Sequence, residues 1–139
     1  METCLPTTVS PLRVRRYRPV HGLEVVVCSR REFVVLLHGE FDLQARPELE
    51  RELEQIAGTA ARRVVVDLTA ASFVDAATLG VLLRAQRRLD AAGGELILVC
   101  NDRHLLRILR LTLLDRAFTI YEHRADAMRL FESRVAGPG

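Results

Sequence analysis

Short apolar runs alternate with helix-length stretches along most of this chain, and the alternation limits the folds that it can adopt. The runs VVVDL at 64–68 and ELILVC at 95–100 have the continuous apolar character of strands that are buried on both faces. Between them, leucines recur at helical spacing, and Gly93-Gly94 follow as a stop signal. Strands that alternate with helices of about 10–15 residues predict βαβ units and a mostly parallel sheet.

The rest of the chain continues this rhythm. Further strands are predicted at 23–29, 33–39 and 118–121, and further helices from Pro47 to Gly58, at 103–112 and at 124–133. The short polar SRRE between the first two strands predicts a hairpin, because parallel pairing needs a longer connection. We therefore expect an α/β fold in the order β-β-α-β-α-β-α-β-α, with a mixed, mostly parallel sheet of about five strands and about four helices.

The 139 residues fit one domain, with a shorter segment at each end. We expect a flexible basic N-terminal arm at 1–22, the folded domain at 23–133 and a C-terminal tail at 134–139. The arm is proline-containing and poor in periodicity, and it carries a local run of arginines. A solvated tail is the simpler interpretation, and an arm that binds a phosphate or a partner is the alternative.

Composition argues against several classes of partner. The net charge is only +2, which gives no case for nucleic acid. No apolar run approaches the ~18 residues that a membrane span needs, and the N-terminus has no secretory apolar core. We expect a cytoplasmic protein without a membrane partner. The segment LLRILRLTLL at 105–114 could pass for a membrane or partner helix, but the βα rhythm favours a core helix flanked by arginine stems.

Catalytic and metal-binding patterns are missing from the sequence. The four histidines are scattered, Ser72 has no glycine elbow, and there is no phosphate-cradling glycine loop. We therefore expect no catalytic residues, no metal and no cofactor, with a small α/β enzyme as the least favoured alternative. Cys28 and Cys100 are interpreted as buried free thiols, with a redox pair between them as the weaker hypothesis.

Acidic residues follow three of the predicted strands. In sheets of this kind functional groups collect in the loops at the carboxyl ends of the strands, here 39–46, 69–78 and 101–103. Asp42, Asp75 and Asp102 fall in these loops. The sequence therefore predicts that the site lies at this edge of the sheet, with Asp75 organising the start of the following helix.

The motifs around Asp75 resemble those of one known family. Asp67-Leu68 closes a buried strand, and FVDAATLG at 73–80 opens a helix at the spacing of the Asp-Ser-Ser-Gly-Leu-Gly motif in STAS domains of bacterial anti-sigma factor antagonists. GEFD at 39–42 is similar to the family's Gly-Glu-Leu-Asp. LTLLD at 111–115 is similar to its Leu-Thr-Gly-Leu-Asp, with leucine in place of glycine. The resemblance covers residues 24–132.

The resemblance implies a function in protein binding. Members of this family bind an anti-sigma factor of the serine-kinase type and so release a sigma factor. The kinase inactivates the antagonist by phosphorylating the first serine after the loop aspartate. It implies a partner-binding surface on this chain made from the loop and helix start, with a rim from neighbouring loops: Asp42, Asp75, Ala76, Ala77, Thr78, Leu79, Gly80, Asn101 and Asp102. A weak homodimer is the other assembly we consider.

This chain departs from the family at the position that the kinase phosphorylates. Ala76 aligns with the acceptor serine, so the usual phosphotransfer cannot occur there, and Ala77 aligns with the second serine. Thr78 is the remaining hydroxyl, and we expect it to be a helix cap rather than a displaced phosphoacceptor. Two binding hypotheses follow: an antagonist that is not switched at this place, or a STAS scaffold or decoy for other STAS proteins or a transport complex.

Overall fold

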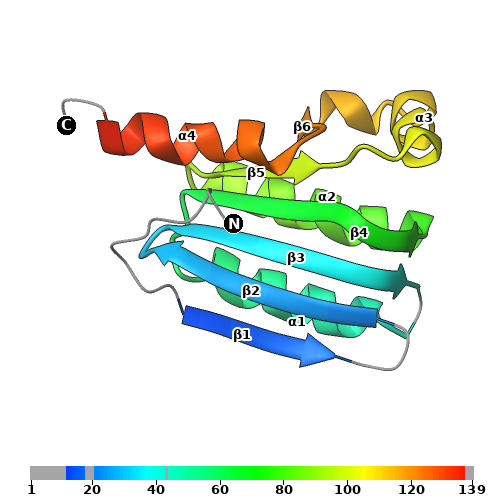
Figure 1. The fold of residues 1–139 in the computed structure, drawn as a ribbon, viewed down its shortest axis with the longest axis horizontal. Helices are drawn as coiled ribbons and strands as arrows, with labels where there is room; N and C mark the ends of the chain where they lie inside the picture. The colour runs from blue at the N-terminus through cyan, green and yellow to red at the C-terminus, as the bar shows by residue number, and fades with distance from the viewer. Residues whose placement is uncertain (1–11, 18–20, 43, 137–139) are drawn as a thin grey trace.

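A six-stranded sheet forms the centre of the molecule in the computed structural model, which describes residues 12–17, 21–42 and 44–136 (Figure 1). The spatial order of the strands follows the chain: β1 (Leu12–Tyr17), β2 (His21–Ser29), β3 (Glu32–Phe41), β4 (Arg63–Val74), β5 (Glu95–Val99) and β6 (Thr119–Tyr121). β1–β2 and β2–β3 pair antiparallel, and the remaining neighbours pair parallel. The mixed, mostly parallel α/β architecture is confirmed.

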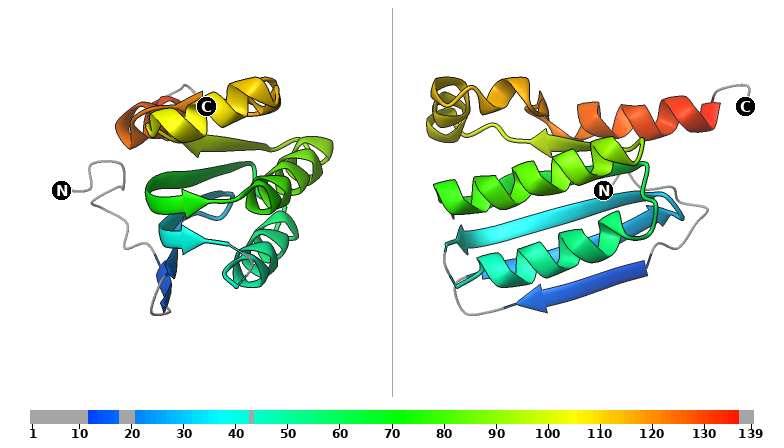
Figure 2. Two further views of the ribbon diagram at one scale, coloured as in Figure 1. Left: turned by 90° about the vertical axis from the view of Figure 1, so that its right-hand side faces the viewer. Right: turned by 180° about the vertical axis from the view of Figure 1, so that it is seen from behind.

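Four helices and one short 3-10 turn connect the parallel strands or follow the last one. They are α1 (Arg46–Ala57), α2 (Ala76–Ala91), α3 (Arg103–Leu111), η1 (Leu114–Arg116) and α4 (Arg124–Ala136). α1 and α2 lie side by side on one face of the sheet, and α4 lies on the other (Figure 2). None of the helices in the described part of the chain is long and apolar enough to cross a bilayer.

The apolar strands supply two cores because successive side chains point to opposite faces. Val64 and Val66 of β4 face the core under α1, α2 and α3, whereas Val65 between them faces the core under α4. Leu105 and Leu109 of α3 are buried in the first core, which confirms that this half of the LLRILRLTLL segment packs inside the protein. The fold thus explains why the central strands read as continuous apolar runs.

The prediction of a flexible N-terminal arm at 1–22 is wrong for residues 12–17 and 21–22. Residues 12–17 form β1, which pairs antiparallel with β2 along its whole length, and residues 21–22 already belong to β2. The segment LRVRRY alternates only weakly, and its arginines obscured the strand pattern. The structure therefore has one strand more than expected, and residues 1–11 and 18–20 lie outside the described part. At the other end, α4 continues through 134–136, which we had expected in the tail.

β4 is longer than the apolar run that predicted it. The strand continues to Val74, so most of the expected 69–78 loop is strand, paired with the last residues of β3. The register shifts twice between these strands, once on each side of the pairs that His38 and Gly39 make, and Gly39 has a φ of 79°. Glycine tolerates that left-handed conformation, which β-branched residues do not. The weak strand-forming sequence TAAS concealed the extension.

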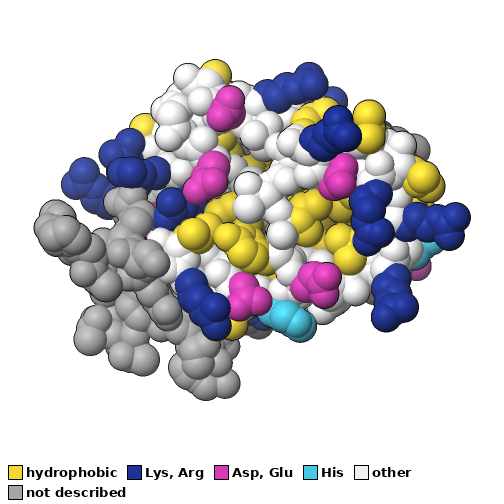
Figure 3. Space-filling view, turned by 90° about the horizontal axis from the view of Figure 1, so that it is seen from above, with side chains coloured by type: hydrophobic (Ala, Val, Ile, Leu, Met, Phe, Trp, Pro, Cys, Tyr) yellow, Lys and Arg dark blue, Asp and Glu magenta, His cyan; other side chains and the backbone are white. Residues whose placement is uncertain are grey.

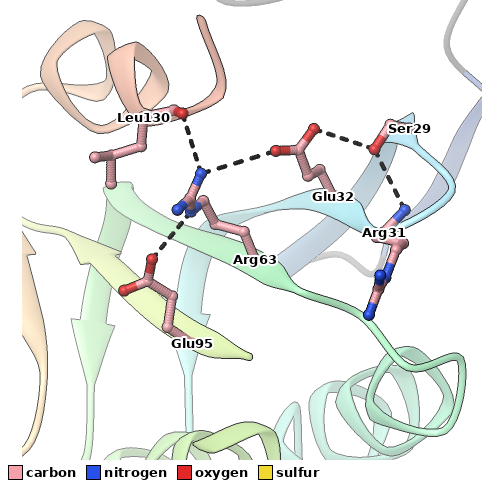
Figure 4. Close-up of polar contacts among 6 residues, drawn as sticks. All are labelled: Ser29, Arg31, Glu32, Arg63, Glu95 and Leu130. Atoms are coloured by element: carbon pink, nitrogen blue, oxygen red, sulfur yellow. Dashed lines mark hydrogen bonds and ion pairs between the residues drawn. The ribbon is translucent and has the colours of Figure 1, made fainter. Parts of the chain in front are cut away.

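β4 contacts α4 through charged side chains at the start and at the middle of the helix. Arg124 Nε at the start of α4 lies 2.9 Å from Oδ2 of Asp67, which is almost fully buried. At the middle of the helix, Arg63 donates to the carbonyl of Leu130 over 3.0 Å, and it also donates to Glu95 Oε2 over 3.0 Å (Figure 4). Because residues four apart on a strand share a face, Arg63 and Asp67 both point towards this helix.

The two cysteines cannot form the redox pair that we considered. Cys28 faces the core under α4, and Cys100 faces the opposite core. Their strands are also separated by β3 and β4, and each step across a sheet is about 4.8 Å. A disulfide needs Cα atoms within about 7 Å and on the same side, so the expectation of buried free thiols is the one that holds.

Candidate protein-docking site

The carboxyl ends of β3, β4 and β5 meet at one edge of the sheet because the three strands are parallel neighbours. Asp42 follows β3, Asp75 follows β4, and Asp102 follows β5 after a short connection. The expectation that these three loops share an edge is confirmed. Two of the three aspartates begin helices, which directs the helix N-termini towards this edge.

Asp75 is the N-cap of α2. Its Oδ1 accepts from the backbone N–H of Thr78 over 2.8 Å, and its own N–H donates to the carbonyl of Phe41 over 3.3 Å. The first bond satisfies one of the N–H groups that a helix leaves without an internal partner. The second ties the helix start to the end of β3. The predicted role of Asp75 in organising this loop is confirmed.

The Asp75 carboxylate is held in its charged form. Partial burial acts to raise its pKa, but the bonds from the hydroxyl and the N–H of Thr78 and the nearby charge of Arg46 together outweigh this, so the pKa lies below the ordinary 3.8. A group with a lowered folded-state pKa contributes stability above its ordinary pKa, and this contribution is lost as the pH falls through the folded value. The cap is therefore fully charged near neutral pH.

Thr78 is a buried part of the loop and not its cap. The side chain is 0% exposed, and its hydroxyl lies 2.7 Å from Asp75 Oδ1 and 3.0 Å from the carbonyl oxygen of Phe41. The single hydroxyl proton is shared between these two acceptors. Our expectation that Thr78 caps the helix itself is wrong in detail, because Asp75 is the cap and Thr78 supplies the N–H that it receives. A kinase would have to open the helix start to reach this hydroxyl.

The first turn of α2 presents a small, exposed surface. Ala76 and Ala77 are exposed, whereas Leu79 is buried in the core. Gly80 is half-buried, and a Cβ placed there would meet only the Arg84 guanidinium, at an ordinary 3.7 Å. Packing within the monomer therefore does not require glycine at this position, although glycine weakens a helix interior by about 0.5–1 kcal/mol relative to alanine.

An apolar groove of about 320 Å³ lies between this helix start and α3. Phe73, which is 52% exposed, forms part of its wall. We name it the β4–α3 groove, and it is lined by Leu68, Ala71, Ser72, Phe73, Val74, Asp75, Ala76, Leu79, Asp102, His104, Leu105 and Ile108. A concave apolar surface beside a flat, small-residue helix start is suited to binding a protein side chain or helix.

The remaining predicted rim residues have different positions. Asp102 lines the groove and caps α3, its Oδ2 accepting from the N–H of Leu105 over 2.9 Å. Asp42 shapes the loop before α1, where its Oδ1 accepts from the N–H of Gln44 over 3.0 Å. Asn101 is exposed on the other side of α3, where it lines a second concavity. Asp42 and Asn101 thus belong to the same edge but do not line the groove.

Sequence reasoning omitted the aromatic and α3 residues of the groove from the predicted site. Phe73 was quoted only as part of a motif, and His104 was considered only as an isolated histidine. The available signal for Phe73 was a large aromatic residue two positions before a helix cap, outside the apolar strand run. Nothing local pointed to α3, because its contribution arises from the packing of two distant elements. Within the described residues, no cluster of acidic, histidine or cysteine side chains could hold a metal ion.

Residues 24–127 match the STAS domain family. The chain belongs to the STAS domain family. A STAS-domain-containing protein of Pseudomonas aeruginosa is 39% identical over 64 residues, which are 46% of this chain and 59% of that protein. The chain therefore matches somewhat more than half of the length of this curated relative.

Solved STAS structures share the fold. An anti-sigma factor antagonist from Mycobacterium paratuberculosis superposes with a TM-score of 0.66 at 23% identity, covering 87% of this chain and 93% of that one. The unphosphorylated form of the anti-sigma factor antagonist SpoIIAA has a TM-score of 0.65 at 19% identity, with 83% and 98% covered. The phosphorylated form of SpoIIAA from Bacillus gives 0.64 at 18% identity, with 78% and 98% covered. Identities this low support the STAS fold alone.

Proposed function

We propose that this STAS domain is an anti-sigma factor antagonist that binds a kinase-type anti-sigma factor and so releases a sigma factor. The observation that carries the proposal is the exposed Ala76-Ala77 surface at an Asp75-capped helix start, beside the apolar β4–α3 groove. Alanines let a partner approach the helix closely, and the groove and Phe73 offer apolar area for it to bury. This is a role in binding and not in catalysis.

The same surface supports a second part of the proposal, that the domain is not switched by phosphorylation at this helix start. Ala76 has no hydroxyl, and the hydroxyl of Thr78 is buried and bonded. A phosphate of roughly −1.5 to −2 charge would fit the dipole of a helix N-terminus but would disrupt a closely packed interface. The wild-type chain lacks the group that would carry this charge, so its activity would depend on abundance or another signal.

Substitution of Ala76 tests the docking surface. Ala76→Glu places a carboxylate at a helix N-terminus, which should leave the fold as stable as the wild type or slightly more so. It should weaken binding to a purified kinase-type anti-sigma factor by about tenfold or more, equivalent to about 1.4 kcal/mol. Isothermal titration calorimetry measures the affinity. The matched control is Ala125→Glu, because Ala125 is also an exposed alanine in the first turn of a helix, α4.

Restoring the hydroxyl tests the lost switch. Ala76→Ser should become a substrate for the same kinase with ATP, and mass spectrometry should locate phosphate on residue 76. The wild type under the same conditions should carry no phosphate on residues 73–80. Phosphate on Thr78 of the wild type would contradict the proposal, and so would co-purification with other STAS proteins while every kinase-type anti-sigma factor fails to bind.

A further inference from the structure

Leu113 has a backbone conformation that leucine rarely adopts. It lies between α3 and η1 with φ 62° and ψ 15°, in the left-handed region where a Cβ is unfavourable. The turn is fixed by the N–H of Leu113 donating to the carbonyl of Arg110 and the N–H of Arg116 donating to the carbonyl of Leu113. Glycine would make this turn without the steric cost. The fold of the monomer therefore gives no reason for a leucine here.

The steric cost of this conformation is not offset by burial of the Leu113 side chain inside the protein. It is 58% exposed, and Leu111, two residues earlier, is 73% exposed. Among the residues whose side-chain burial is described (22–42 and 44–131), the large hydrophobic residues that are more than half exposed are these two leucines and Phe73 of the β4–α3 groove. Two exposed leucines at one corner, one of them in a strained conformation, indicate a surface that another protein covers.

Arginines line the outer face of the helix that leads to this corner, with Glu122 as an acidic neighbour in the same concavity. Arg103, Arg107 and Arg110 are exposed at i, i+4 and i+7 on the outer face of α3, and none forms an ion pair within the described part of the chain. Figure 3 shows basic side chains gathered at the end of the molecule where Figure 1 places α3, with hydrophobic surface beside them. Arg103 is the first residue of α3, where the helix dipole disfavours a positive charge.

We infer that Leu111 and Leu113, with the arginines of α3, bind an apolar pocket bordered by acidic groups on the anti-sigma factor. We call this surface the α3 corner, and its assignment to this partner rests on the proposed function. The positive arginines are complementary to acidic groups at the edge of the partner's pocket, and the leucines are complementary to its apolar centre. α3 also supplies one wall of the β4–α3 groove, and a helix is only about 10–12 Å across, so one partner reaches both surfaces.

The Leu113→Gly substitution distinguishes an effect on the stability of the domain from an effect on its affinity for the partner. The glycine variant should have an equal or higher urea midpoint than the wild type, because it relieves the strain and exposes no core. Its affinity for the purified anti-sigma factor should fall by about tenfold, since burial of a leucine side chain is typically worth at least that much. The matched control is Ala60→Gly, at the other non-glycine residue with positive φ among those described (60°). That variant should keep its affinity.

Paired arginine substitutions test the charge. Arg103→Gln with Arg107→Gln should weaken binding and make the affinity less dependent on salt, because fewer charges are screened. Arg87→Gln with Arg88→Gln removes the same charge from exposed positions in the second half of α2 and should change neither quantity. Circular dichroism and urea unfolding confirm that all variants fold.

The outcomes distinguish the two proposals. If the wild type binds a kinase-type anti-sigma factor and both α3 variants weaken it, the α3 corner is supported. If binding occurs and neither variant weakens it, the α3 corner is wrong and the proposed function stands. If no such factor binds the wild type, the proposed function fails and the partner assigned to the α3 corner fails with it.

Discussion

At the scale of single residues, one short network fixes the helix start at the candidate site. The carboxylate of Asp75 accepts from the N–H and the hydroxyl of Thr78, and the carbonyl of Phe41 lies 3.0 Å from the same hydroxyl oxygen. Each bond joins α2 to the end of β3 or closes the first turn. The network therefore holds the first turn of α2 in place and so positions the exposed Ala76-Ala77 surface, but its hydrogen bonds are made within the domain and not with a partner.

Substitution of Asp75 should reveal the cap by its pH dependence. Asp75→Ala should lower the free energy of unfolding by about 1 kcal/mol at pH 7, the usual worth of an N-cap. Asp75→Asn, which can still accept these hydrogen bonds, should lie near the wild type at pH 7. Because the wild-type pKa is lowered, the advantage of wild type over the alanine variant should shrink as the pH falls below 3.8.

Urea unfolding at about pH 7 and at about pH 3 measures these differences. Asp42→Ala is the control, because Asp42 shapes a loop and caps no helix. A difference between wild type and Asp75→Ala that stays constant through the acidic range would show that the carboxylate charge does not contribute to the cap.

At the scale of elements, α4 is attached to the sheet by electrostatic contacts as well as by apolar packing. The side chains that it buries in the second core are Ala127, Met128 and Phe131. Its two polar attachments to β4 are Arg124 to Asp67, which precedes this apolar cluster, and the Leu130 carbonyl to Arg63, which lies within it. These pairs act together with the apolar contacts to position the helix.

Arg124→Ala should therefore destabilise the protein more than an ordinary surface substitution. It leaves one oxygen of the buried Asp67 carboxylate without its 2.9 Å partner. Exposed ion pairs contribute about 0–1 kcal/mol, and removal of one partner from a buried pair costs about 3–5 kcal/mol; because Asp67 is buried and Arg124 is partly exposed, the expected loss is about 1–2 kcal/mol. The Asp67 Oδ1 contacts with Thr69 remain and limit the loss.

Arg129→Ala is the matched control for this loss. Arg129 lies on the same helix, and its ion pair with Asp126 is exposed, so the variant should stay within about 0.5 kcal/mol of the wild type. Thermal or urea unfolding gives both values. Equal effects of the two substitutions would contradict a special role for the Arg124–Asp67 pair.

At the scale of the whole molecule, the sheet separates two cores and also separates Cys28 from Cys100. Cys28 and Cys100 face opposite sides, and both are almost fully buried. Burial raises the pKa of the Cys100 thiol, so this group stays protonated near neutral pH. A buried, protonated thiol is a poor nucleophile and a poor substrate for oxidation.

Labelling should confirm that neither thiol is a switch. In the native protein both Cys28 and Cys100 should react slowly with a maleimide, and both should react rapidly in urea. Mild oxidation should leave no disulfide between them, as peptide mapping by mass spectrometry can establish. A Cys28–Cys100 disulfide formed without unfolding would mean that the sheet arrangement is wrong.

The order of elements could be predicted from the sequence because its signals are local. Apolar runs and helical stripes fix the βα alternation, and a residue such as Asp75 is recognised as a helix start from its neighbours alone. β1 was missed because a basic edge segment becomes a strand only through pairing with β2. The extension of β4 was missed for the same reason, since its partner in β3 is far away in the sequence.

The features of the candidate site are likewise of two kinds, those that local sequence determines and those that depend on tertiary contacts. The sequence alone determined that Asp75 stands at the start of the helix after β4 and that Ala76 has no hydroxyl to receive a phosphate, because both facts belong to the residues themselves; that Asp75 and not Thr78 is the cap was shown by the structure. Tertiary structure alone decided that Thr78 is inaccessible, that α3 forms a wall of the groove, and that Leu113 is exposed in a left-handed turn. Burial and surface shape arise from contacts between distant segments, which no local pattern encodes.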